Sequence, residues 1–275
     1  MVIERGLPMM NPIYIVHISD THIRPEKSFE IHGRVPYRNL ERLVDALKAL
    51  PTTPKCIVHT GDVVGDGEPE AYELATQLLG TIGVPIYYAA GNHDDPDQVR
   101  DLPMGDTVAT FGGFASYAFD LAGERGIVLH TKGPHEEIGG SGRFPDGQID
   151  FLVEQIEAST GPVSIFLHHC PLHLDCDWHD DKIDLLNGED LHDALVPLSE
   201  RVRGVFFGHI HRGVQIFRDG VHYASVGTPY APLNLWPETE SDAARRDGEA
   251  PLPFNFITLT EQTTIVKEHS VPLDS

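Results

Sequence analysis

The sequence is poor in basic residues and in long apolar runs. Among its 275 residues, 20 Lys and Arg stand against 42 Asp and Glu, which gives a formal net charge of -22. A surface of this charge repels nucleic-acid polymers and anionic membranes, so we expect neither as a partner. No stretch of about 18 consecutive apolar residues occurs, which excludes a hydrophobic transmembrane helix.

Cysteine is also scarce. The chain has 3 cysteines, Cys56, Cys170 and Cys176, which do not resemble the disulfide framework of a secreted domain. The first residues, MVIERGLPMM, lack the positive start and the apolar segment of a secretory signal. We therefore expect reduced thiols and a cytoplasmic location. Cys170 and Cys176 lie near His173 and His179, but this spacing matches no usual zinc pattern, and the Asp-rich surroundings favour a solvated loop.

What the sequence does contain is enough apolar material for a core, since 40% of its residues are hydrophobic. We expect one domain over residues 1–275. Apolar runs typical of strands occur at 13–18, 56–60, 84–90, 163–167 and 205–207. Helical spacing lies between them at 40–50, 68–80, 149–156 (with Asp146 as the expected N-cap) and from about 188. Strand pairs are expected within 116–130, 214–226 and 254–269. The pattern predicts an α/β fold with an antiparallel contribution.

Two stretches rich in Pro, Asp and Gly, 171–188 and 229–253, are long for connections in a compact domain. We expect these long loops to form a substrate wall or an oligomer contact. Leu233, Leu235 and Trp236 would line the pocket or pack into a neighbouring subunit, so a homo-oligomer is a hypothesis.

Residues of the kinds that bind metal ions follow the predicted strands. The strand ends carry Asp20-Thr21-His22, Gly61-Asp62, Gly91-Asn92-His93-Asp94, His168-His169 and Gly208-His209-Ile210-His211. In open α/β sheets, ligands bind beyond the carboxyl ends of the strands, so we expect these clusters to meet on one face. If GHIH is extended, His209 and His211 project to the same side, because alternate residues of a strand share a face.

Two aspartates, an asparagine and several histidines, without a thiolate, suit Mn²⁺, Fe or Zn²⁺. The set is too rich for one ion. Two divalent ions about 3.5–4 Å apart, with one carboxylate bridging them, would use it fully, and such pairs serve phosphoryl displacement. The two histidines of GHIH would then serve one metal each.

The motifs D-x-H, GD, GNHD, HH-x-P and GHxH, in this order, resemble the calcineurin-like metallophosphoesterase superfamily from residue 13 to about 226. ISDTH, GDVVGDGEPEAYELA, GNHDD and NGEDL resemble its class III cyclic-nucleotide phosphodiesterase and glycerophosphodiesterase branch. The resemblance implies a four-layer αββα sandwich of two mixed β-sheets between helices. One departure is Cys170, where this branch often has proline after the two histidines, which leaves the role of His168 intact but makes the following loop uncertain.

The same resemblance implies roles for individual residues. Asp20, His22 and His211 would hold one metal, Asn92, His168 and His209 the other, and Asp62 would bridge them. His93 would be the catalytic residue that protonates the leaving group. Asn92, His93 and His169 are candidate substrate contacts.

The chemistry implied is hydrolysis of small phosphodiesters such as glycerophosphodiesters, cyclic nucleotides or simple aryl and alkyl diesters. Two ions and two aspartates leave the pocket at about +2, which attracts a small anion. A water bridging the ions would become hydroxide near neutral pH and attack phosphorus in line. A phosphomonoesterase or phosphonate-ester hydrolase would use the same ligands. A non-catalytic protein-binding scaffold would be expected to lack a ligand, and a DNA-processing nuclease conflicts with the acidic surface.

Four further residues have two interpretations each. His17 and His59 lie three residues before a ligand aspartate and could support it, although a core histidine with a hydrogen-bond partner is favoured. Arg24 and Arg34 could meet the far end of the substrate, although a solvated loop arginine is favoured.

Overall fold

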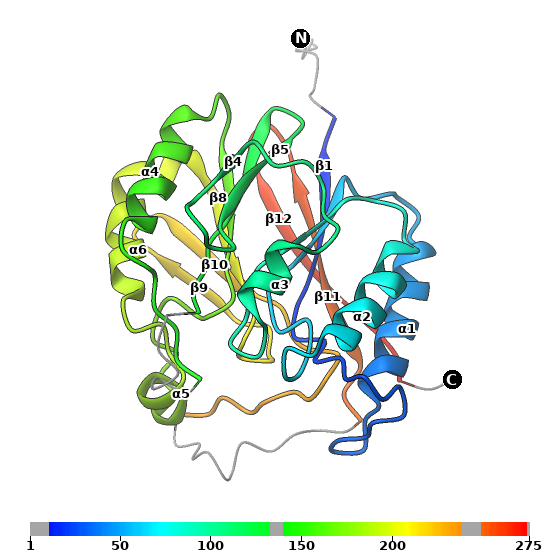
Figure 1. The fold of residues 1–275 in the computed structure, drawn as a ribbon. Coiled ribbons are helices and arrows are strands. Elements are labelled where there is room, and N and C mark those ends of the chain that lie inside the picture. The colour runs from blue at the N-terminus through cyan, green and yellow to red at the C-terminus, as the bar shows by residue number, and fades with distance from the viewer. Residues whose placement is uncertain (1–10, 133–139, 238–248, 274–275) are drawn as a thin grey trace, which may run out of the picture.

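Two mixed β-sheets lie face to face, and helices cover the outer face of each sheet (Figure 1). This computed structural model describes residues 11–132, 140–237 and 249–273. One sheet has 5 strands in the order β12-β11-β1-β2-β3, and the other has 7 in the order β4-β5-β6-β7-β8-β10-β9. The arrangement confirms the αββα sandwich.

The strands of the first sheet are β1 (Ile13–Ile18), β2 (Cys56–His59), β3 (Ile86–Tyr88), β11 (Leu252–Leu259) and β12 (Thr264–Val271). Those of the second are β4 (Ala109–Thr110), β5 (Tyr117–Leu121), β6 (Glu124–Val128), β7 (Val163–Phe166), β8 (Val202–Phe207), β9 (Gln215–Arg218) and β10 (Val221–Ser225). The helices are α1 (Pro36–Lys48), α2 (Pro69–Gly80), α3 (Pro96–Arg100), α4 (Gln148–Ala158), α5 (Asp177–Lys182), α6 (Gly188–Leu195) and the 3-10 helix η2 (Val196–Arg201).

Strand β1 illustrates why the sequence forms layers. Val16 and Ile18 pack with the residues of α1 and α2, whereas Ile13 and Ile15 pack into the space between the sheets. Successive strand residues point to opposite faces, so a strand buried on both faces must be apolar throughout. The strand ends are therefore the first positions where polar side chains can gather.

The helix that covers β7 and β8 differs in one detail from the sequence expectation. Gly147, with φ 81°, precedes α4, and no side chain caps this helix. The prediction that Asp146 caps it was wrong. A positive φ at this position favours glycine, because glycine has no Cβ atom. The chain therefore enters α4 through a glycine turn, without a capping carboxylate.

The stretch 171–188 is not simply a loop, because it contains α5. Cys176 and His179 are buried, so the expectation of a solvated loop was wrong. Cys56, Cys170 and Cys176 are free thiols. Within the described part of the chain, the residues that could hold a metal ion include no cysteine.

The stretch 229–253 is described only in part, since 238–248 lie outside the described residues. Tyr230 and Leu233 are buried, whereas Trp236 is 72% exposed. Across the described ranges, no helix has the length and apolar character needed to cross a bilayer.

Candidate metal centre

The five strand-end motifs meet at one place, but through turns and not through extended strands. Strand β8 ends at Phe207, and His209 and His211 follow it in a turn with φ values of 66° and 54°. The prediction that GHIH continues the strand was therefore wrong, although both imidazoles line the same cavity. The turn, instead of strand alternation, brings the two imidazoles to the same cavity.

Positive φ recurs in three of these motifs. Asp20, His22 and Asp62 also lie in the left-handed region, with φ values of 57°, 44° and 51°. Non-glycine residues rarely adopt this conformation, which costs of order 1–3 kcal/mol per residue and occurs mostly at functional sites. No sequence signal predicted this backbone strain.

Two glycines of the motifs allow the close approach of neighbouring strand ends. A Cβ atom on Gly208 would overlap the Ser19 hydroxyl and lie 2.7 Å from Asp20 Oδ2. A Cβ atom on Gly91 would overlap Asp62 Oδ1. The glycines before His209 and Asn92 are therefore required by packing around the two aspartates.

The first group of metal-capable atoms belongs to Asp20, His22, Asp62 and His211. The Nε2 atoms of His22 and His211 lie 3.1 Å apart, and Asp20 Oδ1 lies 3.4 Å from His211 Nε2. Asp20 Oδ1 is buried and has no hydrogen-bond partner. A buried carboxylate oxygen without a partner is costly unless a cation compensates its charge.

The second group surrounds His168. His168 Nε2 lies 3.0 Å from Asn92 Oδ1 and 3.1 Å from His209 Nδ1. Asp62 Oδ2 lies 3.4 Å from this nitrogen and 3.5 Å from His22 Nε2. One carboxylate oxygen therefore stands between the two groups, where a bridging ligand is expected.

Backbone carbonyls orient three of the four imidazoles. His168 Nδ1, His209 Nε2 and His211 Nδ1 donate to the carbonyl oxygens of Thr60, Ile183 and Ala231 at 2.8, 2.7 and 2.7 Å. A ring that donates with one nitrogen presents a lone pair on the other when it is neutral. The inward nitrogens, the amide oxygen and the carboxylate oxygens are then all acceptors, so the residues present fit bound cations.

The titration of this cluster reflects the same demand for positive charge. Burial raises the pKa of Asp62, but the His168 imidazole outweighs burial and holds this pKa well below 3.8. Burial lowers the pKa of His168, but the Asp62 charge outweighs it and raises this pKa to about 9. Burial, followed by the His168 charge, lowers the pKa of His209 to about 3. A proton on His168 therefore supplies the positive charge that the cluster needs when no cation is bound.

A cavity of 380 Å³ opens onto the cluster. Its lining combines metal-capable residues of the cluster with six other residues. The first set is His22, Asp62, Asn92, His209 and His211, and the second is His93, Arg24, Gly140, Ile183, Tyr230 and Leu233. Both long stretches contribute residues to this lining, Ile183 from 171–188 and Tyr230 and Leu233 from 229–253. The Tyr230 ring packs on His22 with 4.3 Å between ring centroids.

His93 is the exposed imidazole of the pocket. Its backbone N–H donates to Asp62 Oδ1 at 2.9 Å, and its Nδ1 lies 2.8 Å from the Gly65 carbonyl oxygen. The ring centroids of His93 and His22 are 4.9 Å apart. A ring that donates through Nδ1 leaves Nε2 to exchange a proton with a bound molecule.

His169 occupies a different position. Its side chain is fully buried, its Nδ1 lies 2.7 Å from Thr131 Oγ1, and its Nε2 lies 3.1 Å from the Gly140 carbonyl oxygen. It does not line the cavity, and its assignment as a substrate contact receives no support from this geometry. The distances place it behind His209, with 4.5 Å between the ring centroids.

Asp94, the last residue of GNHD, has a structural task that the sequence reasoning missed. It accepts hydrogen bonds from the backbone of Gly91, Val63 and Val64 and from the Tyr72 hydroxyl. Burial, followed by the Asp62 charge, raises the pKa of Asp94 to about 6. Asp94 thus ties the turn that carries Asn92 and His93 to the turn that carries Asp62. The sequence signal that could have predicted this role is the carboxylate that directly follows the Gly-Asn-His motif.

The remaining alternatives have clear outcomes. His17 and His59 are fully buried and contact the Thr60 and Thr21 hydroxyls at 2.9 and 3.0 Å, as expected for core histidines. Arg24 lines the cavity and pairs with Asp66. Arg34 is 2% exposed, so its assignment as a solvated loop arginine was wrong.

The arrangement matches a known family. The family model of the calcineurin-like phosphoesterases matches residues 13–213. The chain belongs to the calcineurin-like phosphoesterase family. This family consists of metal-dependent phosphoesterases, and the protein is an enzyme of that class.

Curated relatives of this phosphoesterase are named phosphodiesterases. Glycerophosphodiester phosphodiesterase GpdQ of Enterobacter lignolyticus is 30% identical over 203 residues, which cover 72% of this chain and 70% of the relative. The 3',5'-cyclic adenosine monophosphate phosphodiesterase CpdA of Pseudomonas aeruginosa is 27% identical over 201 residues, covering 73% and 70%. These relatives place the enzyme in the branch that its sequence motifs resemble.

Among solved structures, the purple acid phosphatase PPD1 from yellow lupin seeds shares the fold with a TM-score of 0.66 at 15% identity. The alignment covers 94% of the phosphoesterase chain and 52% of the lupin protein, so this chain spans about half the length of that neighbour. The comparison supports the two-sheet architecture.

Proposed function

We propose that this phosphoesterase hydrolyses small phosphodiesters with a pair of divalent metal ions. The observation that carries the proposal is the cluster of inward-facing acceptor atoms, in which the buried Asp20 Oδ1 has no hydrogen-bond partner. Such a cluster is stable only with added positive charge. The phosphodiesterase names of the curated relatives support diesters as the substrate class.

The contacts support two groups of ligands. Asp20, His22 and His211 would hold one ion, and Asn92, His168 and His209 would hold the other. Asp62 would serve both, because its Oδ2 atom lies 3.5 Å from His22 Nε2 and 3.4 Å from His168 Nε2. Oxygen and imidazole donors without thiolate favour Mn²⁺, Fe or Zn²⁺. When bound, such a pair polarises phosphoryl oxygens and neutralises charge that develops during displacement.

His93 would act on the leaving group. The Gly65 carbonyl at Nδ1 orients the ring, which leaves Nε2 to give a proton to the departing alkoxide oxygen. His93 lies beside His22 and is exposed, outside the buried cluster, so it would act on the substrate and not as a metal ligand. Asn92 and His93 would also contact the substrate, since both line the cavity.

The cavity favours a small substrate. At 380 Å³ it lies at the low end of the roughly 300–1,000 Å³ that small-molecule sites occupy. Glycerophosphodiesters, cyclic nucleotides and simple aryl or alkyl diesters fit this size class. The formal charge of -22 disfavours a nucleic-acid polymer as substrate.

The test is a comparison of matched substrates under defined metals. Chelated protein is reloaded with Mn²⁺, Zn²⁺ or Fe²⁺ and assayed on bis(p-nitrophenyl) phosphate and p-nitrophenyl phosphate, then on a glycerophosphodiester and a cyclic nucleotide. We expect no activity without metal and a higher kcat/KM on each diester than on its monoester. A preference for the monoester, or for a phosphonate ester, would assign the alternative hydrolase activity. Full activity after complete chelation would refute the metal mechanism.

We further propose that residues 1–275 form one domain, which single-step unfolding in urea would support. Trp236, 72% exposed beside the pocket wall, is the feature that favours self-association. Light scattering that yields the mass of one chain would exclude it.

A reducing compartment such as the cytoplasm is the proposed location. The three cysteines are buried and free, and burial raises the pKa of the Cys56 thiol to about 12. Fractionation of cells that express the chain tests this location.

A further inference from the structure

The segment 228–233 lies against the residues that would hold the first of the two proposed ions. The Ala231 carbonyl oxygen accepts a hydrogen bond from His211 Nδ1 at 2.7 Å. The neighbouring Tyr230 ring packs on the His22 imidazole, with 4.3 Å between the ring centroids. The segment therefore contacts both imidazoles of the first ion.

A third contact joins the same segment to an aspartate. The Thr228 hydroxyl donates to the backbone carbonyl oxygen of Asp20 at 2.6 Å and accepts from the Tyr230 backbone N–H at 2.8 Å. The segment thus contacts every residue assigned to the first ion alone, namely Asp20, His22 and His211.

The imidazoles of the second ion are oriented from elsewhere. His168 Nδ1 donates to the Thr60 carbonyl oxygen at 2.8 Å, and His209 Nε2 donates to the Ile183 carbonyl oxygen at 2.7 Å. Thr60 follows β2 and Ile183 follows α5, so neither belongs to 228–233. A displacement of the segment would therefore act on the first ion and spare the second.

The segment itself belongs to no helix or strand. Its backbone has no ladder of hydrogen bonds to fix it, so side chains from other elements have to supply such bonds. Arg34 Nη2 and Asn39 Nδ2 both donate to the Pro229 carbonyl oxygen, at 3.1 and 2.7 Å. Pro229 lies two residues before Ala231, so the two donors hold the backbone that carries the acceptor of His211.

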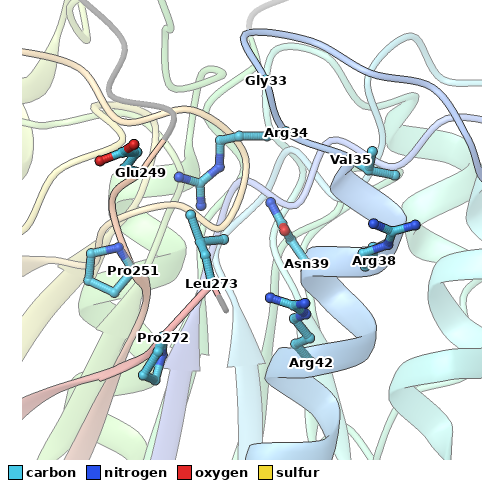
Figure 2. A pocket seen from close by; sticks show the side chains of 10 residues that line it. All are labelled: Gly33, Arg34, Val35, Arg38, Asn39, Arg42, Glu249, Pro251, Pro272 and Leu273. Carbon is cyan, nitrogen blue, oxygen red and sulfur yellow. The ribbon is translucent and has the colours of Figure 1, made fainter. Parts of the chain in front are cut away.

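Arg34 also holds the other end of the long stretch 229–253. Its Nη1 donates to the Ala250 carbonyl oxygen at 2.8 Å. Figure 2 shows the Arg34 and Asn39 side chains pointing into the space between α1 and the chain at Pro251. Neither side chain lines the cavity over the metal cluster. Any effect of these two residues on the site must therefore pass through the backbone that they hold.

Both side chains are buried, with Arg34 2% and Asn39 5% exposed. Arginine is rarely buried unless its guanidinium is paired, because removing the charge from water is costly. Hydrogen bonds from a charged donor are about twice as strong as those between neutral groups. One charged and one neutral donor therefore hold the Pro229 carbonyl firmly.

We propose that Arg34 and Asn39 are positioning residues for the first ion, because they hold the backbone segment that contacts its ligands. The orientation and basicity of a ligating imidazole depend on the acceptor at its other nitrogen, which for His211 is the Ala231 carbonyl. Loss of such a partner typically costs about 10–100-fold in metal affinity. The inference rests on the proposed metal pair and adds to it a support that lies outside the site.

The test compares how four variants retain the two ions. Arg34→Met and Asn39→Ala remove the donors to Pro229, and Arg34→Lys restores one charged donor. The control is Arg201→Met, because Arg201 donates to the Ser159 carbonyl from η2 and does not line the cavity. Protein loaded with Zn²⁺ is dialysed against increasing concentrations of a chelator, and elemental analysis gives the number of ions per chain.

We expect Arg34→Met and Asn39→Ala to lose the first ion at a chelator concentration about tenfold below that for the parent, and the second ion at the parental concentration. Arg34→Lys should lie between Arg34→Met and the parent, and Arg201→Met should match the parent. A role confined to the stability of the fold would lower the melting temperature without separating the two ions.

A double variant identifies which ion has weakened. Asn92→Ala would remove a ligand of the second ion, so Arg34→Met/Asn92→Ala should retain neither ion at a chelator concentration that leaves one in each single variant. Retention of one ion by the double variant would overturn the inference, as would unchanged affinity for both ions, or their joint loss, in Arg34→Met.

The parent protein separates the two levels of failure. If the parent binds no pair of ions, the proposed function fails and the inference fails with it; if the parent binds two ions and Arg34→Met releases both as the parent does, only the inference fails. Should Arg34→Met not fold, Asn39→Ala takes its place in every comparison, because alanine is favourable inside helix α1.

Discussion

The Nε2 atoms of His22 and His211 lie 3.1 Å apart although 189 positions separate the two residues in the chain. The Nδ1–H group of His211 donates a hydrogen bond to the Ala231 carbonyl oxygen, so the inward Nε2 is an acceptor when the ring is neutral. Asp20 Oδ1 faces the same nitrogen from 3.4 Å. This contact between acceptors is the point where a bound cation would contribute most.

Metal binding should therefore stabilise the fold. We expect protein loaded with Mn²⁺ or Zn²⁺ to melt several degrees above the chelated protein, because an ion that binds only the folded state adds its binding free energy. Asp62→Asn should reduce this shift, since it weakens the shared ligand. Melting curves recorded with and without chelator check the expectation, and identical curves would contradict it.

Substitutions of two adjacent residues should separate binding from chemistry. Asn92→Ala should lower metal content, because it removes an oxygen 3.0 Å from His168 Nε2. His93→Ala should retain metal and lose turnover by about 10²–10⁴, as for a general acid. The loss should be smaller for p-nitrophenolate than for an alkoxide leaving group, since the former needs no proton. Elemental analysis and kcat on both substrates check this, and the reverse pattern would refute the assigned roles.

Adding one methyl group at Gly208 should disrupt the metal cluster through its contacts with Ser19 and Asp20. Gly208→Ala would drive a Cβ atom into Ser19 and toward Asp20, so we expect a loss of about 1–3 kcal/mol in stability and a loss of bound metal. Gly80→Ala is the matched control, because nothing lies within 4 Å of its added Cβ and it ends helix α2. Urea unfolding of both variants measures the effect, and equal stabilities would show that the turn can relax.

Buried histidines outside the cluster should make stability depend on pH. Burial is the main cause that lowers the pKa of His17 to about 3 and those of His59 and His130 to about 4. Below about pH 6.5 the unfolded chain takes up protons that the folded chain refuses, so stability falls as pH falls. The slope is about 1.4 kcal/mol per pH unit for each such histidine. His130→Gln should reduce the slope of unfolding free energy between pH 6.5 and 4 relative to the parent. An unchanged slope would show that His130 protonates in the fold.

Local patterns were enough for most of the architecture. The apolar run of β1 and the spacing of Leu40, Leu43, Val44 and Leu47 in α1 predicted their elements, because burial on one or two faces imposes a period on the sequence. The prediction failed at Asp146 and within 171–188, where a glycine turn and the short helix α5 have weak local signals.

The sequence alone determined which kinds of metal-binding side chain follow which strands. Short motifs in the sequence contain these residues, namely Asp20, Asp62, Asn92, His168, His209 and His211. Only the tertiary structure decided that Asp20 and His211 meet through left-handed turns, that His169 contacts Thr131 and Gly140 without lining the cavity, and that Arg34 is buried. The physical reason is the separation along the chain of the residues that interact. Strand and helix periods arise from neighbouring residues, whereas the contact of side chains far apart in the chain depends on how two sheets pack and how each turn is strained to fit.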